Sequence, residues 1–313
     1  MHRLVSPDAR KLGVLIGAVL CLAFGAARAS VLLAYPELIQ DGPAGTIAIV
    51  KGHGAAPDQY RYLPHFLMWG LLSVLTFKQA ITAFVFGGLA VSFMIIKFLA
   101  WPARLPSEKT LVCIFIALIY PLSMPFGARF DTPLQLALVI SGLYLWDRPV
   151  GYFLIVLLCA VTRTDYALAL ALIVLLDAIQ AGRKLIVYVM AAAAPLVMQV
   201  ALMIHFSENA YYANAVTLTE NLRGEIFQAP GFWLCAAIVA FIAVERSRSL
   251  IVSGQKQGTL ALKWGVLLLY LALIVVIGRL REWRLMLPIL PLVLNIYFGP
   301  AHGHDKAADR PAR

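Results

Sequence analysis

The sequence predicts an all-α polytopic membrane protein with about ten transmembrane helices and one outer juxtamembrane helix. Of its 313 residues, 61% are hydrophobic and 13% are charged, and the mean hydropathy is +0.83. A soluble domain carries about 25% charged residues. The apolar runs are continuous and rich in Leu, Ala, Val and Ile, without the period-two alternation of barrel strands. Helices are therefore the structure that satisfies this backbone in lipid.

Eleven apolar runs are candidates for helices that cross the bilayer. They cover residues 12–34, 62–77, 79–100, 110–127, 132–146, 150–162, 165–180, 184–204, 231–244, 260–278 and 285–299. The first run follows Arg3, Arg10 and Lys11, and Ala27-Arg28-Ala29 within it resembles a signal-peptide cleavage site. We favour an uncleaved first span, because apolar residues continue to Tyr35.

The distribution of basic residues indicates which runs cross. If all eleven crossed, the basic segments at 97–109, 183–184 and 246–256 would face outside, against the positive-inside rule. The run 62–77 is short and is interrupted by Pro64 and His65. If it lies at the outer interface instead, sixteen of the 26 basic residues fall inside. We therefore expect ten crossings, with both termini in the cytoplasm.

A single transmembrane domain is expected over residues 1–300, with outer loops at 35–61 and 205–230. Residues 301–313 are expected to form a disordered cytoplasmic tail. The net charge of +10 does not indicate nucleic-acid binding, because the basic residues are scattered between apolar runs. The four cysteines lie inside apolar runs without metal-ligand spacing, as small apolar side chains do.

Charged residues that this topology places outside are candidate functional groups, because a charge near lipid is costly without a partner or a task. Two outer turns share the spacing Arg-x-Asp, at 129–131 and 163–165. Arginine has a planar fork that suits a phosphate. Each Arg–Asp pair has a structural alternative, a self-neutralising contact at the interface. A carboxylate that activates an acceptor hydroxyl is expected in the first outer loop, at Asp58 or Asp41.

Three motifs occur in an order that resembles the GT-C superfamily of polyprenyl-phosphate-sugar-dependent glycosyltransferases, in particular its small bacterial members. The first is Asp58-Gln59-Tyr60-Arg61-Tyr62-Leu63-Pro64. The second is Arg129-Phe130-Asp131 followed by Thr162-Arg163-Thr164-Asp165. The third is Arg281-Glu282-Trp283-Arg284-Leu285-Met286-Leu287-Pro288. The resemblance covers roughly residues 10–300, and it implies a location in the bacterial inner (plasma) membrane.

The resemblance also implies roles for individual residues. An acidic residue of the first outer loop would be the catalytic base or would help to hold a divalent metal, which favours Asp58 and then Asp41. The lipid phosphate would be held by arginines of later outer turns, namely Arg129, Arg163, Arg281 and Arg284. Supporting groups would be Arg61, Asp131, Asp165 and Glu282. Independently of the resemblance, Tyr60 and Trp283 neighbour the charged turns and are the candidates for stacking on the sugar, with a place in the interfacial aromatic belt as the alternative.

The implied reaction moves a sugar from a polyprenyl-phosphate carrier to a glycan or lipid acceptor on the outer face. The expected partners are these substrates and the membrane lipids, and no nucleic acid. One alternative is a transporter or flippase for a lipid-linked or anionic solute, which predicts charges at membrane depth; Asp177 is the main candidate. Another is a polysaccharide polymerase or ligase, or a non-catalytic membrane subunit.

Overall fold

A computed structural model of the chain describes residues 45–54, 60–94, 131–207, 258–277 and 289–298. It also describes single residues between 19 and 34 and residues 233, 237 and 240. Within these residues helices are the only regular secondary structure, so the predicted all-α class is confirmed for this part of the chain. The predicted run 110–127 and the predicted tail 301–313 lie outside the described residues.

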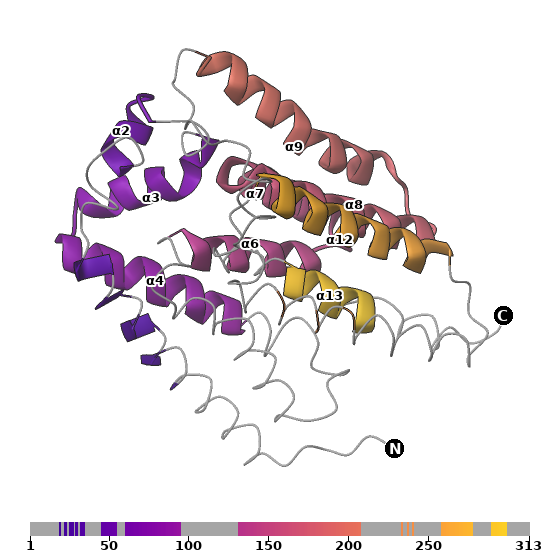
Figure 1. Ribbon diagram of the computed structural model, residues 1–313, viewed down its shortest axis with the longest axis horizontal. Coiled ribbons are helices and arrows are strands. Elements are labelled where there is room, and N and C mark those ends of the chain that lie inside the picture. The colour runs from indigo at the N-terminus through magenta and orange to yellow at the C-terminus, as the bar shows by residue number, and fades with distance from the viewer. Residues whose placement is uncertain are drawn as a thin grey trace.

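From α3 onward the described helices follow the predicted apolar runs closely, whereas α2 lies in the predicted outer loop 35–61, and Figure 1 shows their arrangement. They are α2 (Thr46–Val50), α3 (Tyr62–Leu72), α4 (Phe77–Met94), α6 (Thr132–Tyr144), α7 (Pro149–Thr162), α8 (Thr164–Gln180), α9 (Ile186–His205), α12 (Gly258–Ile277) and α13 (Ile289–Phe298). Helix α3 has 11 residues, so it spans about 16 Å at about 1.5 Å per residue. This is shorter than a hydrocarbon layer of about 30 Å. Because α6 and α7, with 13 and 14 residues, are shorter than that layer too, the interfacial position of the run 62–77 stays a prediction.

Local sequence signals set several helix ends. Proline occupies the first turn of α6 and of α7, where its missing N–H costs no hydrogen bond. Helix α8 ends at Gln180 and is followed by Ala181 and Gly182, and the φ of 62° at Gly182 favours glycine. The N–H of Gly182 donates to the Ile179 carbonyl at 3.1 Å, and that of Arg183 donates to the Ala178 carbonyl at 2.9 Å. This Schellman pattern stops α8 sharply and turns the chain into α9.

The centre of the bundle is formed by α6 and α8. Helix α6 is almost wholly buried, and α8 packs against α7, α9 and α12. Small residues allow close approach: a Cβ added at Gly142 of α6 would lie 2.6 Å from Leu170 of α8. A Cβ added at Gly88 of α4 would lie 2.6 Å from Pro133. Helices α6, α7 and α8 are joined by short turns, so α6 and α8 run in the same direction and α7 runs opposite.

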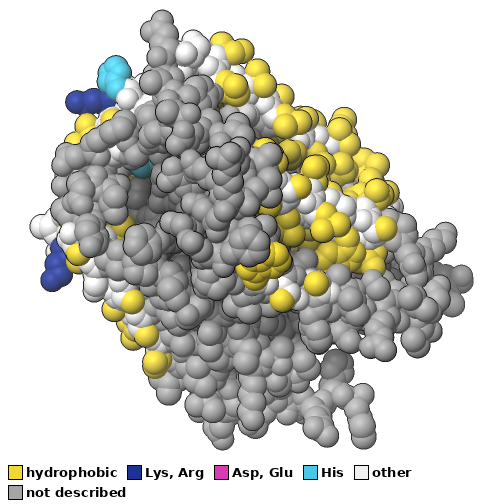
Figure 2. All heavy atoms as spheres, in the orientation of Figure 1, with side chains coloured by type: hydrophobic (Ala, Val, Ile, Leu, Met, Phe, Trp, Pro, Cys, Tyr) yellow, Lys and Arg dark blue, Asp and Glu magenta, His cyan; other side chains and the backbone are white. Residues whose placement is uncertain are grey.

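Two described helices, α9 and α12, are long and apolar enough to cross a membrane. Their apolar windows have mean hydropathies of 2.1 and 2.2, yet only 17% and 22% of those windows are buried. Figure 2 shows apolar side chains gathered over these helices. Shorter apolar helices in the described chain include α6 and α7. The count of ten crossings remains a prediction.

Candidate functional site

Arg163 lies at the single-residue break between α7 and α8. Its backbone is extended, with φ of −159° and ψ of 111°, so it ends one helix and begins the next. Its N–H donates to the Cys159 carbonyl at 2.6 Å, and its carbonyl accepts from the Ala167 N–H at 3.2 Å. These bonds anchor the Arg163 backbone to both helices, which fixes where its side chain emerges.

The Arg163 guanidinium is held in one orientation by two neighbours. Its Nε donates to Oδ1 of Asp165 at 3.0 Å, and its Nη2 donates to Oδ2 at 2.6 Å. Its centre lies 4.1 Å from the centroid of the Tyr166 ring, a cation–π distance. The two bonds to Asp165 use two of the five N–H donors of the guanidinium. The other N–H donors can bind a ligand, because the plane of the guanidinium is already fixed by Asp165 and Tyr166.

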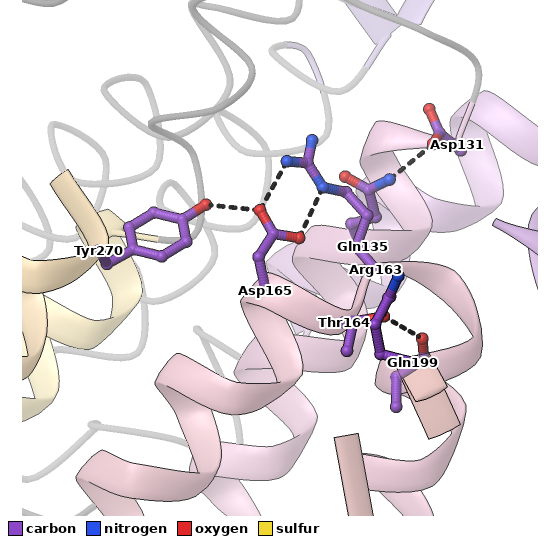
Figure 3. Close-up of polar contacts among 8 residues, drawn as sticks. Asp131, Gln135, Arg163, Thr164, Asp165, Gln199 and Tyr270 are labelled. Carbon is purple, nitrogen blue, oxygen red and sulfur yellow. Dashed lines mark hydrogen bonds and ion pairs between the residues drawn. The ribbon is translucent and has the colours of Figure 1, made fainter. Parts of the chain in front are cut away.

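Residues from other helices meet this pair, as Figure 3 shows for Tyr270. The Tyr270 hydroxyl of α12 donates to Oδ2 of Asp165 at 3.4 Å, and its ring packs edge-on to Tyr166 with centroids 6.0 Å apart. Arg61, just before α3, lies near enough for its positive charge to act on the Asp165 carboxylate. We call Arg61, Arg163, Asp165, Tyr166 and Tyr270 the arginine cluster.

The first turn of α6 carries a second polar pair beside the arginine cluster (Figure 3). Gln135 Nε2 donates to Oδ2 of Asp131 at 2.6 Å, and each residue is 2% exposed. Oδ1 of Asp131 and Oε1 of Gln135 have no hydrogen-bond partner in the part of the chain that the structure describes. Among the described residues this pair therefore leaves two buried acceptors unsatisfied, which is rare in proteins.

The start of α8 is also tied to α9. The Thr164 hydroxyl donates to Oε1 of Gln199 at 2.8 Å, and the side chains come from positions 35 residues apart. Since Gln199 lies near the end of α9 and Tyr270 near the end of α12, both helices run opposite to α8 here. The same end of the bundle thus collects polar residues from α6, α8, α9 and α12.

The structure brings together part of the predicted site. Arg61, Arg163 and Asp165 lie in one cluster, and Asp131 belongs to the neighbouring pair with Gln135. Tyr60 is 6% exposed, so its ring packs within the protein. The remaining predicted residues lie outside the described residues, and their roles stay predictions: Asp41, Asp58, Arg129, Arg281, Glu282, Trp283 and Arg284.

Sequence reasoning missed Tyr270, Gln135 and Gln199. Each is a single polar group inside an apolar run, with no charged neighbour to draw attention to it. The available signal was the cost of placing an amide or a hydroxyl among apolar side chains, which makes a hydrogen-bond partner necessary. That signal identifies the residue but not its partner.

A separate polar cluster lies toward the other end of α8. Asp177 forms an ion pair with Lys263 of α12, and the side chains are 1% and 5% exposed. Asn295 Nδ2 of α13 donates to the second carboxylate oxygen at 2.8 Å. Asp177 follows Asp165 by twelve residues, which is about 18 Å along a helix. We call Asp177, Lys263 and Asn295 together the distal ion pair, after the two charged members. It lies outside the arginine cluster.

Within the described ranges, no group of three or more His, Cys, Asp or Glu side chains is placed to hold a metal ion. No protein-family model, curated protein or solved structure matches this chain.

Proposed function

We propose that this chain is an integral membrane glycosyltransferase that moves a sugar from a polyprenyl-phosphate carrier to a glycan or lipid acceptor on the outer face. The observation that carries the proposal is the Arg163 guanidinium, held in plane by Asp165 and Tyr166 where α12 contacts the start of α8. A donor group ordered before the ligand arrives binds developing negative charge with little reorganisation.

The exposed faces of α9 and α12 support the membrane part of the proposal. Helix α9 has 20 residues, so its length of about 30 Å matches the hydrocarbon layer. Ile186, Val197 and Ile204 of α9 are 71%, 66% and 72% exposed. A soluble protein rarely leaves so long an apolar stripe in contact with water. In a bilayer the same stripe faces lipid.

An apolar groove whose lining residues follow Arg61 and Asp131 closely in the sequence supports a lipid-linked substrate. The groove has a volume of about 530 Å³ and lies between α3, α4 and α6. Its walls include Phe66, Gly87 and Leu134. The α3 wall begins five residues after Arg61, and the α6 wall begins three residues after Asp131. An apolar chain in the groove would therefore have its charged head near the arginine cluster, as a polyprenyl phosphate requires.

The charges of the described site set a requirement on the rest of the chain. Arg61 and Arg163 are balanced by Asp131 and Asp165. An anionic phosphate therefore needs additional positive charge, and the proposal assigns it to arginines of other outer turns, namely Arg129, Arg281 and Arg284. In the proposed displacement, Asp58 takes a proton from the acceptor hydroxyl, and the oxygen of that hydroxyl forms a bond to the anomeric carbon. The carbon–phosphate-oxygen bond breaks, and the arginines stabilise the departing phosphate.

The test uses the full chain in lipid nanodiscs, with transfer from undecaprenyl-phosphate-linked sugars to a membrane acceptor fraction as the assay. Asp58→Asn is expected to reduce transfer by about 10²- to 10⁴-fold, the usual contribution of a general base. Binding of undecaprenyl phosphate should remain, because the base does not hold the phosphate. Lys184→Gln, after the end of α8, is the control. Full transfer in both Asp58→Asn and Asp41→Asn would overturn the assignment of the base.

A transporter is the second candidate, and the distal ion pair favours it. Asp177 and Lys263 are charges buried inside the helical bundle, and transporters use buried charges as coupling groups. Uptake of a labelled lipid-linked or anionic solute by reconstituted vesicles, without a covalent product, would support transport over transfer.

A further inference from the structure

We infer that Asp131 and Gln135 form a subsite that accepts hydrogen bonds from hydroxyl groups of the sugar attached to the carrier phosphate. The inference rests on the proposed function and extends it, since it assigns recognition of the sugar to the first turn of α6. No role in sugar recognition follows from the Arg-x-Asp spacing alone.

The Gln135 amide has one orientation, with its nitrogen toward Asp131. An ionised carboxylate only accepts hydrogen bonds, so the contact at 2.6 Å with Asp131 requires the amide nitrogen as donor. The amide oxygen must then point elsewhere. It is buried and has no partner among the described residues, and neither has Oδ1 of Asp131. The pair thus presents two acceptor atoms and needs two donors from a ligand.

The packing of α6 against α8 sets where Asp131 and Gln135 lie relative to Arg163. Gly142 of α6 is in close approach to Leu170 of α8, and the two helices run in the same direction. Gln135 precedes Gly142 by seven residues, and Arg163 precedes Leu170 by seven residues. Seven residues make about two helical turns. Gln135 therefore lies on the same face of α6 as Gly142, and Arg163, just before α8, lies in line with Leu170. Gln135 and Arg163 therefore lie at the same end of these two neighbouring helices, and Figure 3 draws them in one view.

Arg163 and the pair of Asp131 and Gln135 suit different parts of one ligand. The donors of Arg163 suit an anion, whereas the acceptors of Asp131 and Gln135 repel an anion and suit hydroxyl donors. A ligand that satisfies both carries a phosphate and hydroxyl groups close together. A sugar on a polyprenyl phosphate has this composition, because its ring hydroxyls lie within a few bonds of the phosphate. Sites that accept specific hydroxyls discriminate strongly against ligands that lack them.

The experiment compares two kinds of lipid on the full chain in nanodiscs. One probe is undecaprenyl phosphate, and the others are undecaprenyl phosphates that carry glucose, mannose or arabinose. The wild-type chain should bind at least one glycosylated probe about tenfold more tightly than the plain lipid, since one net hydrogen bond contributes about that factor. Gln135→Met should remove most of this increment and leave binding of the plain lipid unchanged. Asp131→Asn should also remove most of the increment, while the plain lipid binds at least as tightly as to the wild-type chain, because a negative charge near the phosphate is lost.

Gln180→Met is the matched control, because Gln180 lies at the far end of α8, where its Oε1 accepts from Thr259 at 3.3 Å. It should keep the full increment. The inference is overturned if the wild-type chain binds all probes equally, or if a variant that binds the plain lipid normally keeps the increment. Loss of the increment on addition of EDTA would also overturn it, in favour of a metal ion. If the wild-type chain binds neither kind of lipid, the proposed function itself fails.

Discussion

At the scale of single residues, the arginine cluster shows why arginine and lysine are not equivalent. Arg163 uses one edge of its guanidinium to contact Asp165 and one face to contact Tyr166. A lysine ammonium has no edge and no plane, so it can keep the charge without keeping the orientation. The role of Arg163 therefore depends on geometry as well as charge.

We predict that Arg163→Lys weakens binding of undecaprenyl phosphate by about tenfold and transfer by about 10²-fold, because a positioned donor to developing charge is lost. Titration with the lipid and a transfer assay on the same preparation would measure the two effects. Arg183→Lys, in the turn after α8, is the control and should bind as the wild-type chain does. Equal affinities for wild-type and Arg163→Lys would contradict a phosphate-binding role.

At the scale of helices, glycines allow a direct test of the groove. A Cβ added at Gly70, Gly87 or Gly265 would meet no atom within 4 Å. Gly70 and Gly87 line the groove, whereas Gly265 lies on α12 outside it. Leucine at each position also has a better helix propensity than glycine. Fold stability should therefore not fall in any of the three variants.

We predict that Gly87→Leu and Gly70→Leu reduce affinity for undecaprenyl phosphate several-fold, because a leucine side chain occupies space that the apolar chain would fill. Affinity for a short-chain alkyl phosphate should be unchanged, since its alkyl chain would not reach along the groove. Gly265→Leu should bind both lipids as the wild-type chain does. Normal undecaprenyl phosphate affinity in both groove variants would exclude this groove as the site of the lipid chain.

The distal ion pair joins three helices through side chains that are almost fully buried. Removing one partner of such a pair leaves an uncompensated charge, which usually costs about 3–5 kcal/mol, whereas replacing both partners costs little. We therefore predict that Asp177→Leu lowers the thermal unfolding midpoint markedly in detergent. Asp177→Leu combined with Lys263→Met should recover most of the loss. If the double variant is no more stable than Asp177→Leu, Lys263 is not the group that the carboxylate compensates.

At the scale of the whole molecule, the proposed site requires one orientation in the membrane. The distribution of basic residues among the loops predicts that α9 enters the membrane from the cytoplasm near Lys184 and leaves it on the outer face near Ser207. Both positions are exposed at the ends of the helix. The outer end of α9 is also the end that carries Gln199, which contacts Thr164 next to Arg163.

We predict that Ser207→Cys reacts with a membrane-impermeant maleimide in intact cells, and that Lys184→Cys reacts only after the membrane is permeabilised. The wild-type chain provides the background, because its described cysteine, Cys159, is buried. The reverse labelling pattern would place the arginine cluster on the cytoplasmic face. Labelling of both variants from one side would mean that α9 does not cross.

The sequence by itself determined the helices and the most local contacts. Apolar runs and flanking Pro or Gly act over a few residues, so α7, α8 and α9 begin and end close to the predicted positions. The contact between Arg163 and Asp165 joins residues two apart, and the Arg-x-Asp spacing offered it as the structural alternative to a phosphate-binding arginine.

Only the tertiary structure decided which helix faces meet. The Tyr270 contact to Asp165 spans 105 residues, and the contacts of Asp177 to Lys263 and Asn295 span 86 and 118. Helices rich in Leu, Ala and Val on every side carry little periodic signal, because lipid and neighbouring helices both accept apolar faces. Their rotation is set by packing at contacts such as Gly142 with Leu170. That packing aligned Gln135 with Arg163, which residue spacing could not predict.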